Sequence, residues 1–175
     1  RMVTCNGPTV RHWCAFNVPA VAQVCSKARP EKIRGVVQAL SSDTDVETRA
    51  TLAAGIHETT TVLAEGPLRE EMLGAIAVLM NDQNPQVRMN SLGHFASILS
   101  VLADSTPQIL IPPTGASPES QNGKTGMIVS SKSRQLGPIV SSLETMSHDS
   151  WRTQKLLAEQ LEKSAKLIPQ DMLCE

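Results

Sequence analysis

The feature that most constrains this chain is an internal repeat with a period of about 39 residues. Arg49 and Arg88 lie 39 residues apart, and Arg11 lies 38 residues before Arg49. Asp43 and Asp82 each precede their arginine by six residues. A period near 40 residues is typical of repeats built from two antiparallel helices. The sequence therefore predicts an all-α fold of helical hairpins, none of which can bury its apolar stripe without its neighbours.

The apolar positions of the units coincide on both sides of the arginines. Positions four, seven and fourteen residues after each arginine are apolar, and these intervals share one helix face. The matched sets are Ala15, Ala53 and Leu92; Val18, Ile56 and Phe95; and Cys25, Leu63 and Leu102. The first helices match in the same way at Ile33, Val37 and Leu40; Met72, Ile76 and Leu79; and Ile139, Leu143 and Met146.

A fourth unit departs from this spacing. We align Arg152 with the other arginines, 64 residues after Arg88. Its aspartate, Asp149, precedes it by three residues instead of six. The spacing therefore does not predict a regular aspartate–arginine contact for this unit.

The repeats divide a single domain, residues 1–175, into about three and a half repeats of the two-helix type. The units span residues 8–28, 30–65, 67–103 and 133–170. Only nine residues precede Val10, too few for a first helix, so we expect the chain to be a segment of a longer array.

Residues 104–133 differ in composition, with four prolines and three glycines among many serines and threonines. This composition is typical of a flexible loop, here inserted between the third and fourth units. Thr106 and Ser117, each followed by proline, are candidate phosphorylation sites, although we favour ordinary loop composition as the explanation of these two motifs.

The second helix of the third unit is expected to run unbroken from Pro85 to Leu102. Pro85 suits a first helical turn, where its missing N–H has no partner to lose. Gly93 in the middle costs about 1 kcal/mol relative to alanine. We expect the close approach of a neighbouring helix to offset that cost.

The segments from Asp43 to Arg49 (D-x-D-x-x-x-R) and from Asp82 to Arg88, together with the 39-residue pitch, resemble HEAT repeats. The segment DSWRT, Asp149 to Thr153, is similar to repeats of the scaffold subunits of protein phosphatase 2A and the regulatory subunits of protein phosphatase 4. This resemblance implies an α-solenoid, a right-handed superhelix of antiparallel helix pairs. It also implies a non-catalytic scaffold whose intra-repeat turns bind a Ser/Thr phosphatase catalytic subunit and further regulatory subunits.

The resemblance implies two roles for residues near the turns. The candidate partner-binding residues are Asp43, Asp45, Asp82, Gln86, Arg88, Asp149, Trp151 and Arg152. The candidate ladder between adjacent repeats consists of Arg11, Asp45, Arg49, Asp82 and Arg88. In the second role, which we favour for the ladder charges, they hold the repeats together and set the curvature and do not contact a partner.

Composition narrows the classes of function. A net charge of −1 gives no general attraction to nucleic acid or to an anionic membrane, and no apolar run approaches the roughly 18 residues of a membrane span. Cys14 and Cys25 lie eleven residues apart, about 16 Å along a helix, too far for a disulfide. We expect free thiols in a cytoplasmic protein, with the nucleus as a second compartment.

No motif for catalysis or cofactor binding stands out. His57-Glu58 begins like the zinc motif H-E-x-x-H, but Thr61 replaces the second histidine. We therefore expect no metal, no cofactor, no small-molecule substrate and no enzymatic activity. The alternative to a phosphatase scaffold is a generic HEAT adaptor for transport, chromatin or translation machinery, which would bind through its second helices.

Overall fold

The computed structural model describes residues 7–25, 28–63, 68–104 and 130–165. All regular structure within these residues is helical, and they contain no strand. The helices are α1 (Pro8–Cys25), α2 (Pro30–Ser41), α3 (Val46–Leu63), α4 (Leu68–Met80), α5 (Pro85–Leu92), α6 (Phe95–Asp104), α7 (Ser130–Ser147) and α8 (Trp151–Ser164). The prediction of an all-α fold is confirmed.

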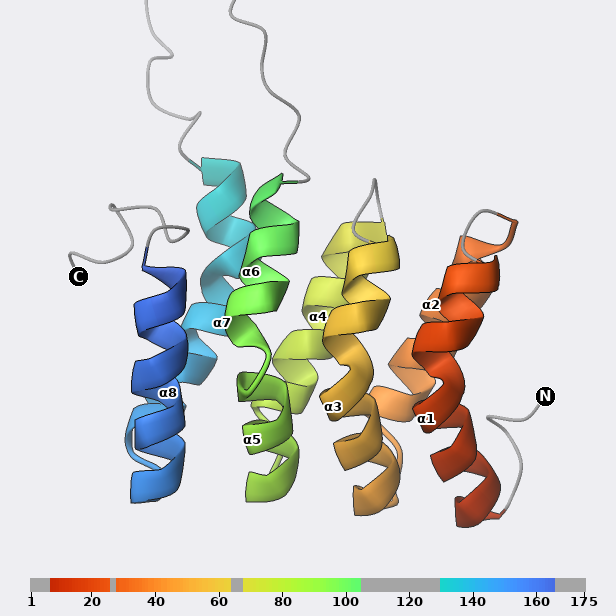
Figure 1. The fold of residues 1–175 in the computed structure, drawn as a ribbon, viewed down its shortest axis with the longest axis horizontal. Helices are drawn as coiled ribbons and strands as arrows, with labels where there is room; N and C mark the ends of the chain where they lie inside the picture. Colours follow the sequence, from red (N-terminus) through yellow and green to blue (C-terminus); the bar gives the residue numbers. More distant parts are fainter. Residues whose placement is uncertain (1–6, 26–27, 64–67, 105–129, 166–175) are drawn as a thin grey trace, which may run out of the picture.

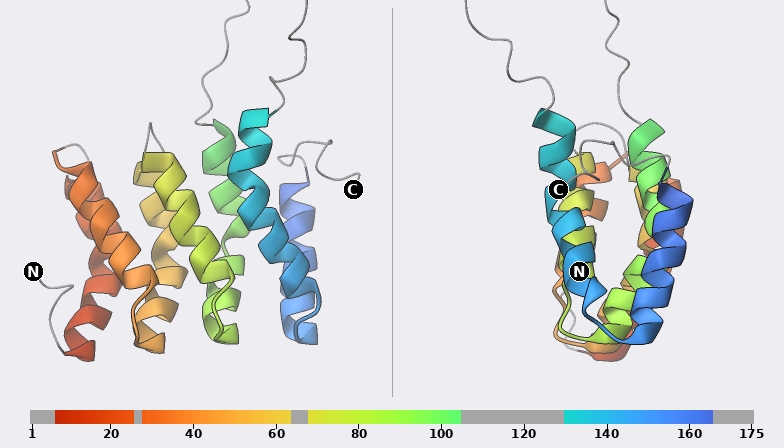
Figure 2. Two further views of the ribbon diagram at one scale, coloured as in Figure 1. Left: turned by 180° about the vertical axis from the view of Figure 1, so that it is seen from behind. Right: turned by 90° about the vertical axis from the view of Figure 1, so that its left-hand side faces the viewer.

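The helices form two layers (Figures 1 and 2). One layer contains α1, α3, α5, α6 and α8, and the other contains α2, α4 and α7, with contacts between neighbours in each layer. The pairs α2–α3, α4–α5 and α7–α8 are antiparallel hairpins. Their three short turns lie along the same edge of the two layers. Hairpins that follow one another in the chain therefore pack side by side.

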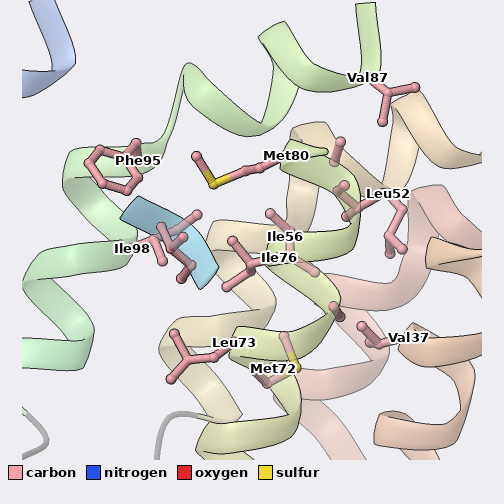
Figure 3. Packing of buried hydrophobic residues seen from close by; sticks show 14 of the residues in the cluster. Val37, Leu52, Ile56, Met72, Leu73, Ile76, Met80, Val87, Phe95 and Ile98 are labelled. Carbon is pink, nitrogen blue, oxygen red and sulfur yellow. The ribbon is translucent and has the colours of Figure 1, made fainter. Parts of the chain in front are cut away.

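The core is a continuous band of apolar side chains between the layers (Figure 3). Val37 of α2, Ile56 of α3, Ile76 of α4 and Phe95 of α6 are each at most 1% exposed. These are positions that the repeat pattern places on the apolar faces, because each recurs at helical spacing. Burying one side chain of this size contributes about 1.5–3 kcal/mol to folding.

The second helix of the third unit is broken, contrary to the expectation of one helix from Pro85 to Leu102. It ends at Leu92 and α6 begins at Phe95, so the backbone leaves the helix around Gly93. No atom of a neighbouring helix lies within 4 Å of a Cβ built at this glycine. The nearest atoms to a Cβ built there are backbone oxygens of α5, at 3.5 and 3.6 Å. The proposed compensation by close packing was therefore wrong.

A side chain of α8 occupies the break between α5 and α6. Gln160 is 4% exposed, and its Nε2 donates to the carbonyl of Gly93 at 3.0 Å. Its Oε1 accepts from the N–H of Ala96 at 3.1 Å. A helix break leaves backbone groups that need new partners. The amide of Gln160 supplies both a donor and an acceptor there.

The two helices at the ends of the row expose different surfaces. The large apolar residues exposed on α1 are Val10, Trp13, Phe16, Val21 and Val24. The exposed side chains of α8 include Lys155, Glu159 and Glu162, beside Trp151 at its start. The outer face of α1 is thus largely apolar and that of α8 largely polar.

Candidate functional site

Three arginine–aspartate pairs link successive hairpins, and we call them the Arg–Asp ladder. They are Arg11–Asp43, Arg49–Asp82 and Arg88–Asp149. In each pair Nε donates to one carboxylate oxygen at 2.6–2.9 Å, and Nη2 donates to the other at 2.8–3.1 Å. Bidentate pairs of this kind fix both distance and direction. The ladder therefore attaches the turn of each hairpin to the helix that precedes it in the row.

Two of these arginines also hold the turn of their own hairpin. Nη1 of Arg49 donates to the carbonyl of Asp43 at 2.7 Å, and Nη1 of Arg88 donates to that of Asp82 at 2.8 Å. Each guanidinium thus joins its own turn to the next one. The turns are connected in series as a result.

The two polar residues of the turn before α3 have different tasks. Asp43 accepts the N–H of Asp45 at 2.9 Å and offers its carboxylate to Arg11. Asp45 caps α3 instead, because its Oδ2 accepts the N–H of Thr48 at 2.9 Å and the hydroxyl of Thr48 at 2.7 Å. The assignment of Asp45 to the ladder was therefore wrong, and Asp43 is the ladder residue of this turn.

In the turn before α5, the two polar residues have the same two roles. Asp82 accepts the N–H of Asn84 at 2.8 Å and binds Arg49. Asn84 is the N-cap of α5 and accepts the N–H of Gln86 at 2.9 Å. In both turns two polar residues are separated by one other residue. The first polar residue binds the arginine of the ladder, and the second caps the following helix.

Burial and pairing act in opposite directions on the ladder carboxylates. Burial opposes ionisation of Asp82, but hydrogen bonds from Arg49 and a backbone N–H outweigh it and hold the pKa of Asp82 below its usual value of 3.8. The pKa of Asp43 is lowered in the same way, with Arg11 as the donor. The hydrogen bond to Asp82 raises the pKa of Arg49. These ladder pairs are therefore fully ionised at neutral pH.

The ladder does not continue through α8, where Gln154 takes the place of an arginine. Arg49 and Arg88 are each the fourth residue of their helix, and the fourth residue of α8, counted from Trp151, is Gln154. Its Nε2 donates to the carbonyl of Asp149 at 3.1 Å, as the arginines do to their own turns. A neutral amide cannot form the outgoing ion pair.

The alignment of Arg152 with the ladder arginines was therefore wrong. The turn before α8 is one residue shorter, because Asp149 is followed directly by the N-cap, Ser150. Arg152 is exposed, and its guanidinium carbon lies 5.4 Å from the centre of the Trp151 ring. Asp149 nevertheless accepts both donors from Arg88, so the fourth unit is joined to the third.

Five of the eight candidate binding residues form ion pairs or a helix cap within the chain, whereas Gln86, Trp151 and Arg152 are exposed along the turns together with other side chains. A cavity of about 360 Å³ opens between the turns before α3 and α5, and Val78 at this cavity is 47% exposed. Trp151, the first residue of α8 after the next turn, is 67% exposed. We call this surface the turn edge, made of Ser42, Val78, Gln83, Gln86, Trp151 and Arg152.

Two histidines join α3 to the break between α5 and α6. The rings of His57 and His94 are stacked, with centroids 3.8 Å apart and an angle of 5° between their planes. Burial lowers the pKa of His94, and the proximity of His57 lowers it further. The stack therefore favours the neutral form of His94. The two histidines lie in different units, so their spacing in the sequence does not indicate that they meet.

The described residues were also examined for metal-binding groups, reactive thiols and membrane-spanning helices. Among them, no group of three or more His, Cys, Asp or Glu side chains is placed to hold a metal ion. Cys14 and Cys25 are free, half-buried thiols. None of the helices described is both long and apolar enough to cross a membrane. The candidate phosphorylation sites Thr106 and Ser117, and most of the predicted 104–133 loop, lie outside the described residues.

Comparisons with protein-family models, with curated proteins and with solved structures found nothing that matches this chain. The geometry of the turns and the HEAT-like motifs are therefore the basis for a functional assignment.

Proposed function

We propose that the chain is part of a HEAT-type α-solenoid and serves as a non-catalytic scaffold that binds a Ser/Thr phosphatase catalytic subunit along the turn edge. The Arg–Asp ladder is the observation that supports this function best. Its ion pairs run from turn to turn and keep the exposed turn residues in one row. Binding of a partner across several turns costs less conformational entropy of the scaffold when the spacing of the turns is already fixed.

The turn edge carries the kind of side chains that anchor protein interfaces. Trp and Arg are enriched among residues that contribute most to binding, and Trp151 and Arg152 lie together there. Val78 provides an exposed apolar contact beside the 360 Å³ cavity. The mechanism is positioning, because a scaffold that holds enzyme and substrate raises the effective concentration of one for the other.

A generic adaptor for transport, chromatin or translation machinery is the second candidate. It would bind through the layer of α1, α3 and α5. The groove on that layer, described below, is the observation that favours it.

The test is titration of the purified chain with purified catalytic subunits of protein phosphatases 2A and 4. We expect saturable binding that weakens at least tenfold when Val78→Glu and Trp151→Ala are combined. The matched control combines Val24→Glu and Trp13→Ala, because these residues are also exposed but lie on α1. Circular dichroism checks that both variants fold.

Two results would contradict the phosphatase assignment. One is the absence of binding to either catalytic subunit. The other is an equal loss of affinity in the turn-edge and control variants. Recovery of transport or chromatin proteins without any phosphatase from cell extract would favour the adaptor instead.

A further inference from the structure

A groove of about 600 Å³ lies where α1, α3 and α5 meet. Its floor consists mainly of small residues of α3, among them Ala54 and Gly55. Pro19 of α1 packs directly on this floor, since a Cβ on Gly55 would lie 3.1 Å from its Cγ. Phe16 lines the α1 side and is 62% exposed. The middle of the groove is thus a shallow apolar surface beside an exposed aromatic ring.

The two ends of the groove are acidic. Glu47 and Glu58 both line it, and both are exposed. They lie eleven residues apart on one face of α3, about 16 Å along the helix. Among the residues that the structure describes, no lysine or arginine lines the groove. His57 lies 3.9 Å from the Glu58 carboxylate. The groove is therefore negative at both ends, with mainly small and apolar side chains between them and with Asn17 and Thr51 among its polar lining residues.

The α5 side of the groove offers polar groups at a fixed position. Nδ2 of Asn90 donates to the carbonyl of Ala50 on α3 at 2.9 Å, and Nε2 of Gln86 donates to Oδ1 of Asn90 at 2.8 Å. This chain orients the Gln86 amide, whose oxygen can accept a hydrogen bond from a peptide N–H.

We infer that this groove binds an extended segment of a partner protein in which two basic side chains flank an apolar one. Alternate residues of an extended peptide point to the same side, and the rise is about 3.3 Å per residue. In the pattern Arg-x-Leu-x-Arg, both arginines and the leucine therefore share one face, with the arginine Cα atoms about 13 Å apart. Flexible arginine side chains span the remaining distance to Glu47 and Glu58, and the leucine contacts the floor beside Phe16.

The groove shares only Gln86 with the turn edge. This inference does not depend on the phosphatase proposal, because its test needs no phosphatase. The probe is a fluorescein-labelled peptide, Gly-Arg-Ala-Leu-Ala-Arg-Gly amide, titrated with the full chain by fluorescence anisotropy. Two control peptides replace both arginines with glutamate or the leucine with serine. We expect saturable binding of the probe and at least tenfold weaker binding of each control peptide.

The variant that tests the site combines Glu47→Lys and Glu58→Lys, and we expect it to bind the probe at least tenfold more weakly. Its matched control combines Glu144→Lys and Glu162→Lys, which make the same charge change at exposed positions on α7 and α8. We expect this control to bind like the unmodified chain. If the lysine variant does not fold, as judged by circular dichroism, Glu47→Gln with Glu58→Gln provides the same comparison.

Three outcomes would overturn the inference. The first is no saturable binding of the probe. The second is an equal loss in the groove variant and the α7–α8 control, which would mean that net charge alone attracts the peptide. The third is equal binding of the leucine and serine peptides, which would mean that the apolar floor makes no contact.

Discussion

Replacing Asp82 with alanine removes one carboxylate from the centre of the Arg–Asp ladder. The side chains of Asp82 and Arg49 are only 6% and 15% exposed. Removing one partner of a buried ion pair costs about 3–5 kcal/mol, because the other charge stays buried without compensation. The turn also loses the acceptor for a backbone N–H, about 1 kcal/mol. Because Arg49 retains some contact with water, we expect a total of about 3 kcal/mol.

The measurement is urea unfolding followed by circular dichroism, with two comparison variants. Glu159→Ala breaks the Lys155–Glu159 pair, which is 70% and 50% exposed, and should cost less than about 0.5 kcal/mol. Asp45→Ala removes only a helix cap and should cost about 1 kcal/mol. The reasoning would be refuted if Asp82→Ala cost no more than Glu159→Ala.

A double-mutant cycle isolates the pair itself. Combining Arg49→Ala with Asp82→Ala should give a coupling free energy of about 1.5–3 kcal/mol, since the two side chains share two hydrogen bonds. Simple additivity of the two single losses would show that the pair contributes nothing beyond its separate residues.

Three other predictions follow from the packing. Gly74→Ala, with nothing within 4 Å, should raise the melting temperature through a gain of about 0.5–1 kcal/mol, whereas Gly55→Leu should lower it because α1 occupies that space; a gain at both positions would contradict the contact. Gln160→Leu should cost about 2 kcal/mol in urea unfolding, because the α5–α6 break loses a donor and an acceptor, and a neutral effect would show that water replaces them. The lowered pKa of His94 means that the unfolded chain binds more protons, so this contribution to stability is complete above pH 6.5 and declines as the pH falls below it. The urea midpoint should fall less between pH 7.5 and pH 5 in His94→Phe than in the unmodified chain, and identical slopes would rule out this contribution.

The helices and most of the core could be predicted from the sequence. Positions such as Ile56 and Ile76 recur at helical spacing, and that periodicity depends only on which face of a helix is buried. The break at Gly93 could not be read in this way, because the apolar pattern continues through it. The side chain that satisfies it, Gln160, lies 67 residues later in the chain.

The ladder was predictable in outline but not residue by residue. Asp43 and Asp45 are both acids in one turn, and only the backbone of that turn decides which one faces Arg11 and which one caps α3. In the fourth unit the turn is shorter by one residue, so Gln154 occupies the position of the ladder arginines. Arg152 lies two residues earlier and was aligned with them only because it is an arginine that follows an aspartate. The groove was not predicted, because its lining residues come from three helices. Many of them are small residues that belong to no recognisable sequence motif.

The most direct test of the series of linked turns is an NMR measurement of the arginine Nε–H groups. Arg11, Arg49 and Arg88 each donate Nε–H to an aspartate in the structure, and Arg152 is exposed. We predict sharp, slowly exchanging Nε–H signals for the first three and rapid exchange with water for Arg152. Each signal should disappear selectively when its own aspartate is replaced by alanine. Equally rapid exchange at all four arginines would contradict the ladder and, with it, the fixed row of turns on which the proposed scaffold function depends.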